Sequence, residues 1–258
     1  MIVAGCDVGS LSAEAVILNN ESIVAYDIIR VRPRPEQSAE DVMGTALSKS
    51  GLSYDDIDFC VSTGYGRENI PFAQGNVSEI SCHGKGAQWL IPSVRTIIDV
   101  GGQDCKAITV DENGDLVNFL MNDKCASGTG RFLEGVSKTL GISLEELAAL
   151  SLKGEKELLI TSVCSVFAET EALSLINEGE TLSDVAAGIS LAMAKRINSL
   201  VKRIGIKNDV CFTGGVAKNP GVVKAIEKIL DVNVINLPED PQIIGALGAA
   251  LFARERAA

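Results

Sequence analysis

This sequence is short of positive charge. Its 258 residues contain 23 lysines and arginines against 34 aspartates and glutamates, which gives a formal net charge of −11 at pH 7. Because such a surface repels a phosphate backbone, nucleic acid is not expected as a partner. Long apolar runs are missing too. The longest, at residues 243–253, carries two glycines and falls short of the roughly 18 residues that a membrane helix needs.

Signals for export and for disulfide formation are also lacking. The chain opens with an apolar stretch that has no basic region or cleavage site. The seven cysteines are odd in number, and no two are spaced as Cys-x-x-Cys. We therefore expect a cytoplasmic protein with reduced thiols. Four of the cysteines lie in strand-like apolar runs, where cysteine behaves as a small core residue: Cys6, Cys60, Cys105 and Cys211.

A duplicated unit organises the chain. Residues 2–10 form an apolar strand that ends in Asp-x-Gly-Ser, and residues 96–104 form another that ends in Asp-x-Gly-Gly. In each copy two further apolar runs follow. In the second copy Asn-Gly separates these two runs, which is a strong hairpin signal. Helical segments come after each meander. The pattern predicts an α/β protein of two similar, tightly hinged lobes, residues 1–94 and 95–258.

Capping residues and helix breakers indicate where the helices begin and end. Gly51 and Gly205 follow helical segments, Ser143 and Thr181 open capping boxes, and Asn219 precedes a proline suited to a first helical turn. The helices expected from these signals cover residues 36–49, 79–90, 182–204, 220–230 and 241–254, with one more after Ser143. The last strands are expected at residues 210–213 and 232–235.

Three glycine-containing turns point to phosphate binding. Two are the Asp-x-Gly turns at Asp7 and Asp99, and the third is Gly214-Gly215 after the strand at 210–213. Such turns leave backbone N–H groups free to hold phosphate oxygens at close range, and an adjacent aspartate can hold Mg²⁺, usually through water. Three ordinary tight turns are the alternative interpretation.

Two cysteines have a different setting from the rest. Cys125 stands before a Gly-Thr-Gly turn at the expected start of a helix, and Cys164 stands before a second expected helix. The N-terminus of a helix favours negative charge and so stabilises a thiolate. Together with the phosphate turns, these cysteines indicate a protein that joins nucleotide chemistry to a metal cluster.

On these motifs the sequence resembles the ATPase superfamily of actin, hexokinase and heat-shock chaperones. The Asp7 and Asp99 turns match its two phosphate motifs, and residues 212–216 match its adenosine motif. More narrowly, the chain is similar to the ATP-dependent activators of 2-hydroxyacyl-CoA dehydratases and to the related subunits of benzoyl-CoA reductase. The narrow match covers nearly the whole chain and rests on residues 62–67, 79–83, 121–133, 164–169 and 245–250.

The resemblance implies two actin-like (ribonuclease H-like) lobes with ATP or ADP and Mg²⁺ in the cleft between them. It implies a homodimer that shares one [4Fe–4S] cluster, held by Cys125 and Cys164 of each subunit. Such a protein accepts an electron from a ferredoxin or flavodoxin. It passes the electron at low potential, driven by ATP, to an iron–sulfur reductase or a dehydratase.

The resemblance also implies roles within the cleft. Asp7 and Asp99 would organise Mg²⁺, and Gln103 and Asp104 would position the attacking water. The residues expected around the nucleotide are Gly9, Ser10, Leu11, Gly101, Gly102, Gly214, Gly215 and Asn219.

The first phosphate turn departs from the family pattern. Relatives usually carry threonine and lysine where this chain has Leu11 and Glu14, so a hydroxyl and an ammonium are lost. The orientation of Glu14 is left open at this point. Two other functions stay open as well: a small-molecule kinase, although no substrate-binding constellation is visible, and a non-redox regulatory ATPase in which both cysteines are core residues.

Three single residues are expected to be structural or are left open. His83, the only histidine, is expected to lie on a helix surface or in packing, and a response to redox or nucleotide state is the alternative. Arg67 is expected to form an ion pair or to contact a partner, and Trp89 to lie in the core or at an interface.

Overall fold

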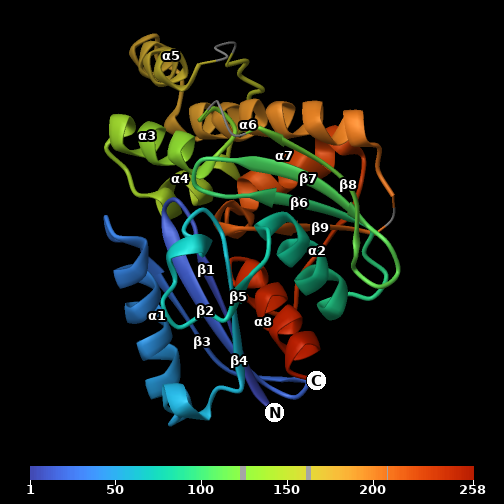
Figure 1. The fold of residues 1–258 in the computed structure, drawn as a ribbon. Coiled ribbons are helices and arrows are strands. Elements are labelled where there is room, and N and C mark those ends of the chain that lie inside the picture. Colours follow the sequence, from blue (N-terminus) through green and yellow to red (C-terminus); the bar gives the residue numbers. More distant parts are fainter. Residues whose placement is uncertain (123–125, 161–163, 208) are drawn as a thin grey trace.

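The structure is a computed structural model that describes residues 1–122, 126–160, 164–207 and 209–258. Two five-stranded mixed sheets dominate it (Figure 1). The first sheet has the order β3-β2-β1-β4-β5. Its strands are β1 (Ile2–Val8), β2 (Ser12–Asn19), β3 (Ser22–Arg30), β4 (Phe59–Thr63) and β5 (Gly75–Asn76).

The second sheet repeats the first. Its order is β10-β9-β6-β7-β8, so that in both sheets the first strand is antiparallel to the second and parallel to the fourth. Its strands are β6 (Thr96–Val100), β7 (Cys105–Val110), β8 (Leu116–Asn122), β9 (Val210–Thr213) and β10 (Val234–Ile235). The duplication predicted from the Asp-x-Gly turns is confirmed.

The helices follow the predicted caps. Ser143 and Glu146 form a reciprocal capping box, and Thr181 and Asn219 accept hydrogen bonds from the first turns of their helices. The eight α-helices of the described residues are α1 (Pro35–Ser50), α2 (Glu79–Leu90), α3 (Gly130–Leu140), α4 (Leu144–Ser151), α5 (Ser165–Asn177), α6 (Leu182–Ile204), α7 (Pro220–Leu230) and α8 (Ile244–Ala257).

Two element ends differ from expectation. The last helix begins at Ile244 rather than at residue 241, because Asp240 first forms a turn. Its Oδ1 accepts a hydrogen bond from Gln242 N at 2.9 Å, and its carbonyl accepts one from Ile243 N at 3.1 Å. The last strand, β10, covers only two of the four residues expected for it.

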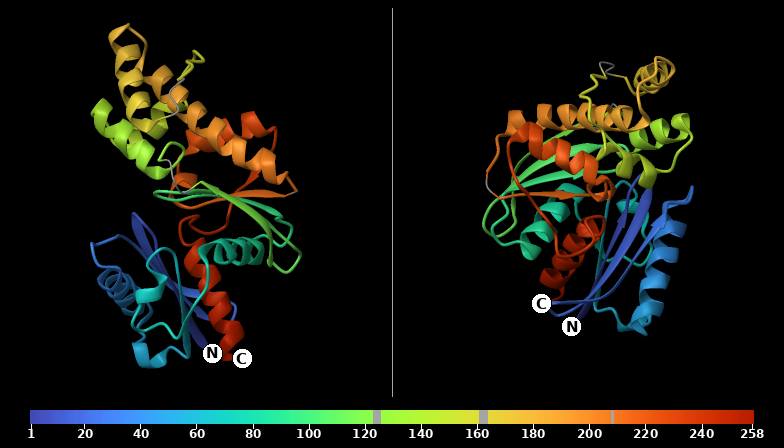
Figure 2. Two further views of the ribbon diagram at one scale, coloured as in Figure 1. Left: turned by 45° about the horizontal axis from the view of Figure 1, so that its top comes forward. Right: turned by 180° about the vertical axis from the view of Figure 1, so that it is seen from behind.

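The elements stack in layers (Figures 1 and 2). Helix α1 packs against the first sheet, and α6 packs against the second with α7 beside it. Helices α2 and α8 form the middle layer and pack against each other. Helix α8, at the end of the chain, lies on β1 and β4, whereas α2, from the first part of the chain, contacts the strands of the second sheet. Each of these two helices therefore packs on the sheet of the other half of the chain. The boundary expected between residues 94 and 95 lies between α2 and β6.

Glycines permit the backbones of the middle layer to touch. A Cβ added to Gly248 of α8 would overlap the carbonyl of Cys82 in α2, and one added to Gly5 of β1 would overlap the backbone of α8 at Ala246 and Ala250. Buried apolar side chains of α2, α8 and both sheets surround these contacts in one continuous core. The described helices include none that is long and apolar enough to cross a membrane.

The Gly248 contact predicts a large loss of stability for a small substitution. Gly248→Ala should lower the free energy of unfolding by about 1–3 kcal/mol, because its methyl group would force α8 away from α2. Gly44→Ala is the matched control, since no atom lies within 4 Å of the added Cβ and alanine favours the helix α1 that contains it. Urea unfolding of both variants checks this, and equal stabilities for the two would contradict it.

Candidate active site

A cleft of about 640 Å³ lies between the two sheets. Turns at the ends of β1, β4, β6 and β9 line it, and α3, α4 and the turn before α8 close its sides. Of the residues expected around the nucleotide and its cation, the structure brings together Asp7, Gly9, Ser10, Leu11, Asp99, Gly101, Gly102, Asp104, Gly214, Gly215 and Asn219. Gln103 is exposed and does not line the cleft.

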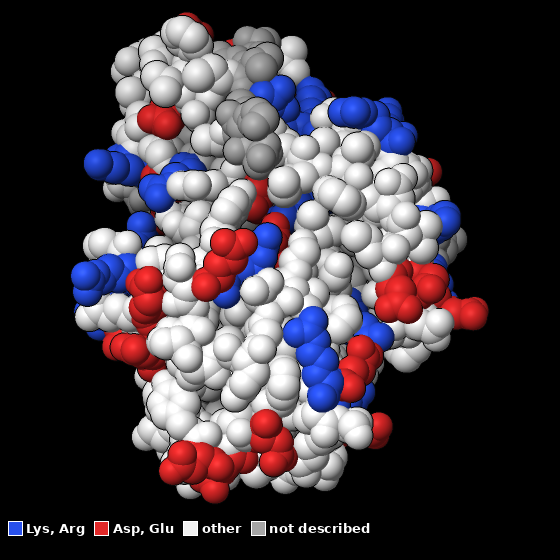
Figure 3. Space-filling model, in the orientation of Figure 1, with Lys and Arg blue, Asp and Glu red and all other residues white. Residues whose placement is uncertain are grey.

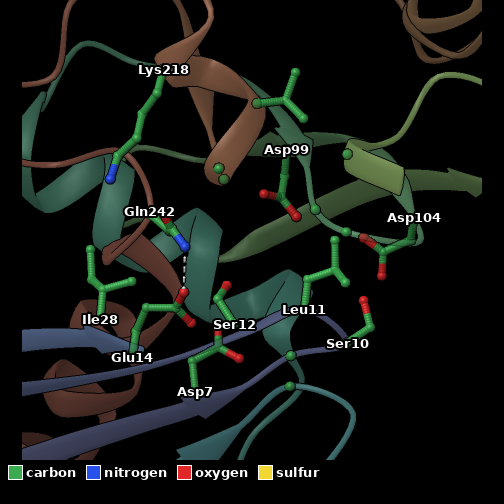
Figure 4. Close-up of a pocket in the computed structure, with 18 of the residues that line it drawn as sticks. Asp7, Ser10, Leu11, Ser12, Glu14, Ile28, Asp99, Asp104, Lys218 and Gln242 are labelled. Atoms are coloured by element: carbon green, nitrogen blue, oxygen red, sulfur yellow. Dashed lines mark hydrogen bonds between the residues drawn. The ribbon is translucent and has the colours of Figure 1, made fainter. Parts of the chain in front are cut away.

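The two aspartates occupy equivalent places in the duplicated unit. Asp7 is near the end of β1 and Asp99 is near the end of β6, each the central strand of its sheet. Both are buried, and their carboxylates reach the cleft from opposite walls (Figure 4). Thr213, the register partner of Asp99 on β9, donates its hydroxyl to Asp99 Oδ1 at 3.1 Å.

A buried lysine joins the second phosphate turn to Asp99. The Nζ of Lys106 lies 2.8 Å from Asp104 Oδ1 and 3.2 Å from Asp99 Oδ2. Burial acts to raise the pKa of Asp99, but His83 and Lys106 lower it further than burial raises it, so Asp99 is ionised. Burial acts to lower the pKa of Lys106, and the two aspartates more than reverse this. The second wall of the cleft is thus a buried ion-pair network in which one lysine serves two aspartates.

Sequence reasoning missed Lys106. It opens one of the apolar runs that follow Asp99, and in β7 it is paired directly with Asp99 of β6. A lysine that opens an otherwise apolar strand, seven residues after the aspartate of a phosphate turn, is the signal that could have found it.

The first wall is different, because its paired buried side chains are two carboxylates. Glu14 of β2 is the register partner of Asp7 and is 4% exposed. Its Oε1 accepts a hydrogen bond from Gln242 Nε2 at 2.9 Å (Figure 4). Burial raises the pKa of Asp7 to about 6, and burial together with Asp7 raises the pKa of Glu14 well above its usual 4.5. Glu14 therefore faces the cleft, which answers the question of its orientation.

The phosphate turns approach each other and the strand ends closely. Gly214 has a φ of 83°, and a Cβ on it would overlap the carbonyl of Val100 in the neighbouring strand. A Cβ on Gly102 would lie 2.5 Å from Cγ of Leu11, so the two Asp-x-Gly turns are in contact through that leucine. Asn219 lines the cleft, and its Oδ1 accepts from Gly221 N and Val222 N to cap α7. The turns thus present backbone groups and few side chains to a ligand.

The three singled-out residues are all placed by the structure. His83 is buried and lines the cleft, which agrees with packing, the second of the two settings expected for it. Arg67 forms an ion pair of 3.2 Å with Glu79, which is the ordinary interpretation given for it. Trp89 packs against the core between the two sheets.

The cysteines separate as expected where the structure describes them. Cys6, Cys60, Cys105 and Cys211 are buried free thiols, and burial raises the pKa of Cys60 to about 12. Cys164 is exposed and is the N-cap residue of α5. Cys125 lies outside the described residues, and the next helix, α3, begins five residues later at Gly130. Within the described parts of the chain, no three histidine, cysteine or acidic side chains are grouped to hold a metal ion.

Two duplicated sheets that hold paired Asp-x-Gly turns across a cleft define an ATPase of the actin-like α/β fold. The chain belongs to the BadF/BadG/BcrA/BcrD ATPase family, which matches residues 4–253. It is 46% identical over 258 residues to an activator of lactoyl-CoA dehydratase from Anaerotignum propionicum, covering 100% of this chain and 99% of that protein. It is 45% identical over 261 residues to the 2-hydroxyisocaproyl-CoA dehydratase activator of Clostridioides difficile, covering 100% and 96%.

Solved structures agree with the sequence comparison. The activator of 2-hydroxyisocaproyl-CoA dehydratase from Clostridium difficile with bound ADPNP superimposes with a TM-score of 0.95 at 45% identity, covering 100% of this chain and 96% of that one. A glucokinase of the ROK family from Streptomyces griseus matches at a TM-score of 0.58 and 14% identity, which shows a shared fold alone.

The raised pKa of Asp7 predicts a pH-dependent stability. The folded value, about 6, lies above the unfolded 3.8, so the folded protein holds this proton more tightly and loses stability when Asp7 ionises. The loss is absent below pH 3.8, grows from there to pH 6, and reaches on the order of 2–3 kcal/mol above it. Asp7→Asn should therefore stabilise the nucleotide-free protein at about pH 8 but hardly at about pH 4. Urea unfolding at both pH values tests this, and equal effects would refute it.

The position of Glu14 in the cleft predicts tighter nucleotide binding on charge reversal. Glu14→Lys should lower the Kd for ADP by roughly five-fold, about 1 kcal/mol, because it places a cation opposite Asp7 where phosphate is expected. Glu40→Lys, on the exposed face of α1, changes the net charge equally and should have no effect. Calorimetric titration of ADP measures both. Weaker binding in Glu14→Lys would mean that Glu14 helps to hold the cation.

Proposed function

We propose that this protein is an ATP-hydrolysing electron donor that activates an iron–sulfur reductase or a 2-hydroxyacyl-CoA dehydratase by one-electron transfer at low potential. It would act in the cytoplasm as a homodimer and receive its electron from a ferredoxin or flavodoxin. The names of its relatives support this proposal, since they include dehydratase activators and a component of the benzoyl-CoA reductase of Thauera aromatica.

The cleft has the groups that Mg²⁺ and ATP or ADP require. Ionised Asp99 and Asp7 supply carboxylate oxygens from opposite walls, which suits a cation held through water. Gly101 and Gly102 present backbone groups of the second turn, and Gly214 and Gly215 those of the adenosine turn. Asp104, fixed by Lys106, is the group we assign to positioning the attacking water; exposed Gln103 would join it only if the turn moved.

The observation that carries the proposal is a hydrogen-bonded path from the second Asp-x-Gly turn to α3 and α5, the helices that follow Cys125 and Cys164. The backbone N–H groups of Gly130 and Arg131, at the start of α3, donate to the carbonyls of Gly101 and Gly102 at 2.9 and 3.0 Å. Helix α3 therefore takes its position from the turn that would bind the terminal phosphates. The segment that contains Cys125 directly precedes it.

Helix α3 is in turn hydrogen-bonded to α5. The hydroxyl of Thr139 in α3 donates to Glu169 Oε2 of α5 at 3.1 Å, and Glu169 also lies against Gly135. Cys164 is the N-cap of α5. Arg30 of β3 adds a contact from the first half of the molecule, an ion pair of 3.2 Å with Glu134 of α3. A movement of the two walls would thus shift both helices that follow the candidate ligands.

The surroundings of Cys164 suit a ligand shared between subunits. The thiol is exposed at a helix N-terminus, where a thiolate is stabilised. Val166 and Phe167, in the next turn, are 64% and 68% exposed, and α5 projects from the body of the molecule (Figure 2). A second copy would cover these side chains. When bound, a [4Fe–4S] cluster held by two Cys125 and two Cys164 thiolates would carry one electron at low potential.

The surface offers a place for an acidic electron source. Basic side chains gather along α6, although the chain as a whole is acidic (Figure 3). They belong to Lys195, Arg196, Lys202 and Arg203. A basic patch steers acidic partners to the surface that carries it, so an acidic ferredoxin or flavodoxin would approach the molecule from this side.

The proposal predicts which cysteine holds iron. Cys164→Ala should abolish cluster binding after anaerobic purification, whereas Cys60→Ala, which removes a buried core thiol of β4, should retain it. Iron content and the visible absorbance of the cluster measure the outcome, and the proposal requires about four iron atoms per dimer. Four per monomer would contradict the shared site. A colourless wild-type protein with ATPase activity would favour a regulatory ATPase or a kinase instead.

A further inference from the structure

His83 lies at the junction of the two halves. It belongs to α2, which packs against α8 on one side and against the second sheet on the other. Its side chain is 7% exposed, and it lines the cleft together with both phosphate turns. The family assignment and the ATPase site above give it no role.

The imidazole lies between the carboxylates of Asp7 and Asp99. Nδ1 is 3.5 Å from Asp99 Oδ1. On the other side, a Cβ on Gly245 would lie 3.0 Å from His83 Nε2 and would overlap Asp7 Oδ2, so these two atoms are neighbours across that glycine. The ring therefore lies between the aspartates of the two duplicated turns, 3.5 Å from Asp99 and without an ion pair to Asp7 among the described residues.

The partners of the two aspartates show why this matters. Asp99 already has Thr213 at Oδ1 and Lys106 at Oδ2. No hydrogen bond or ion pair among the described residues reaches the carboxylate of Asp7. Nδ1 of His83 is itself buried without a hydrogen-bond partner in that part of the chain. A buried, unpaired ring nitrogen is costly unless a ligand or a small movement of the walls completes its bonding.

We propose that His83 is a positioning residue for ATP hydrolysis, which sets the separation of the Asp7 and Asp99 carboxylates once a small movement of the walls completes its hydrogen bonds. Imidazole carries its two nitrogens on opposite edges of a planar ring. A protonated ring donates from both and can bond one carboxylate on each edge, whereas a neutral ring donates from one nitrogen only. The rigid ring, rather than two flexible side chains, then sets the distance between the two walls of the cleft. A cation held through water by both aspartates requires such a fixed distance, and so does the phosphate beside it.

The test is a set of substitutions at one position. His83→Ala should lower kcat for ATP hydrolysis by roughly 100-fold, the scale of a small misplacement of reacting groups, with the KM for ATP nearly unchanged. The Mg²⁺ concentration for half-maximal rate should rise about 10-fold, because the carboxylates are no longer held together. His83→Asn keeps a donor near Nδ1 and His83→Gln keeps one near Nε2, so at least one of them should recover part of the rate and of the Mg²⁺ response.

A control on the same helix separates this role from packing. Gln88 of α2 donates to the carbonyl of Glu112 outside the cleft, at 2.7 Å, and Gln88→Ala should keep the wild-type rate and Mg²⁺ dependence. A wild-type Mg²⁺ response in His83→Ala would overturn the proposal. So would an equal loss of stability and of Mg²⁺-free ADP binding in all three His83 variants, because that pattern belongs to a structural residue.

The role of His83 rests on the proposed assignment of Asp7 and Asp99 to the ATPase site, and one further variant keeps the two apart. Asp99→Asn should abolish hydrolysis. If it does not, the active-site assignment fails. If it does, while His83→Ala hydrolyses ATP normally, the role of His83 alone is refuted.

Discussion

The contact between α2 and α8 is the constraint on which the rest of the structure depends. Each helix packs on the sheet that the other part of the chain forms, and the two touch backbone to backbone where Gly248 meets Cys82. Even one added methyl group would push the two helices apart, so their contact fixes the distance between the two sheets. The same contact sets the width of the cleft between the Asp-x-Gly turns, and the width of the space that the side chain of His83 occupies.

The duplication holds in topology but not in charge. In the second half, Asp99 forms an ion pair with Lys106 from the next strand. His83 and Lys106 lower the pKa of Asp99, so it stays ionised although it is buried. In the first half, the equivalent place on β2 carries Glu14, so Asp7 faces another carboxylate, and burial raises the pKa of both. One wall therefore keeps its buried aspartate ionised, whereas the buried carboxylates of the other wall take up protons more readily than free ones do. The route from this cleft to Cys164 uses few bonds, two from the second phosphate turn to α3 and one from α3 to α5.

The sequence by itself determined the duplicated unit, most helix ends and the phosphate turns, because local signals encode them. Alternating apolar runs, Asn-Gly, capping serines and Asp-x-Gly act over a few neighbouring residues and do not need the rest of the fold. The identity of the buried cysteines follows from the same patterns. The family resemblance added the proposed cluster ligands, of which Cys125 lies outside the described residues.

Only the tertiary structure decided the rest, because it depends on residues that are distant in the chain. Lys106 looked like the start of an apolar strand until β6 placed Asp99 beside it. His83 looked like a packing residue until α2 carried it between two turns 92 residues apart. Glu14 could have faced either way until Gln242, which follows the second sheet in sequence, met it across the cleft. The burial and the charged neighbours of these three side chains arise only when the two sheets are brought together, so no local sequence pattern encodes them.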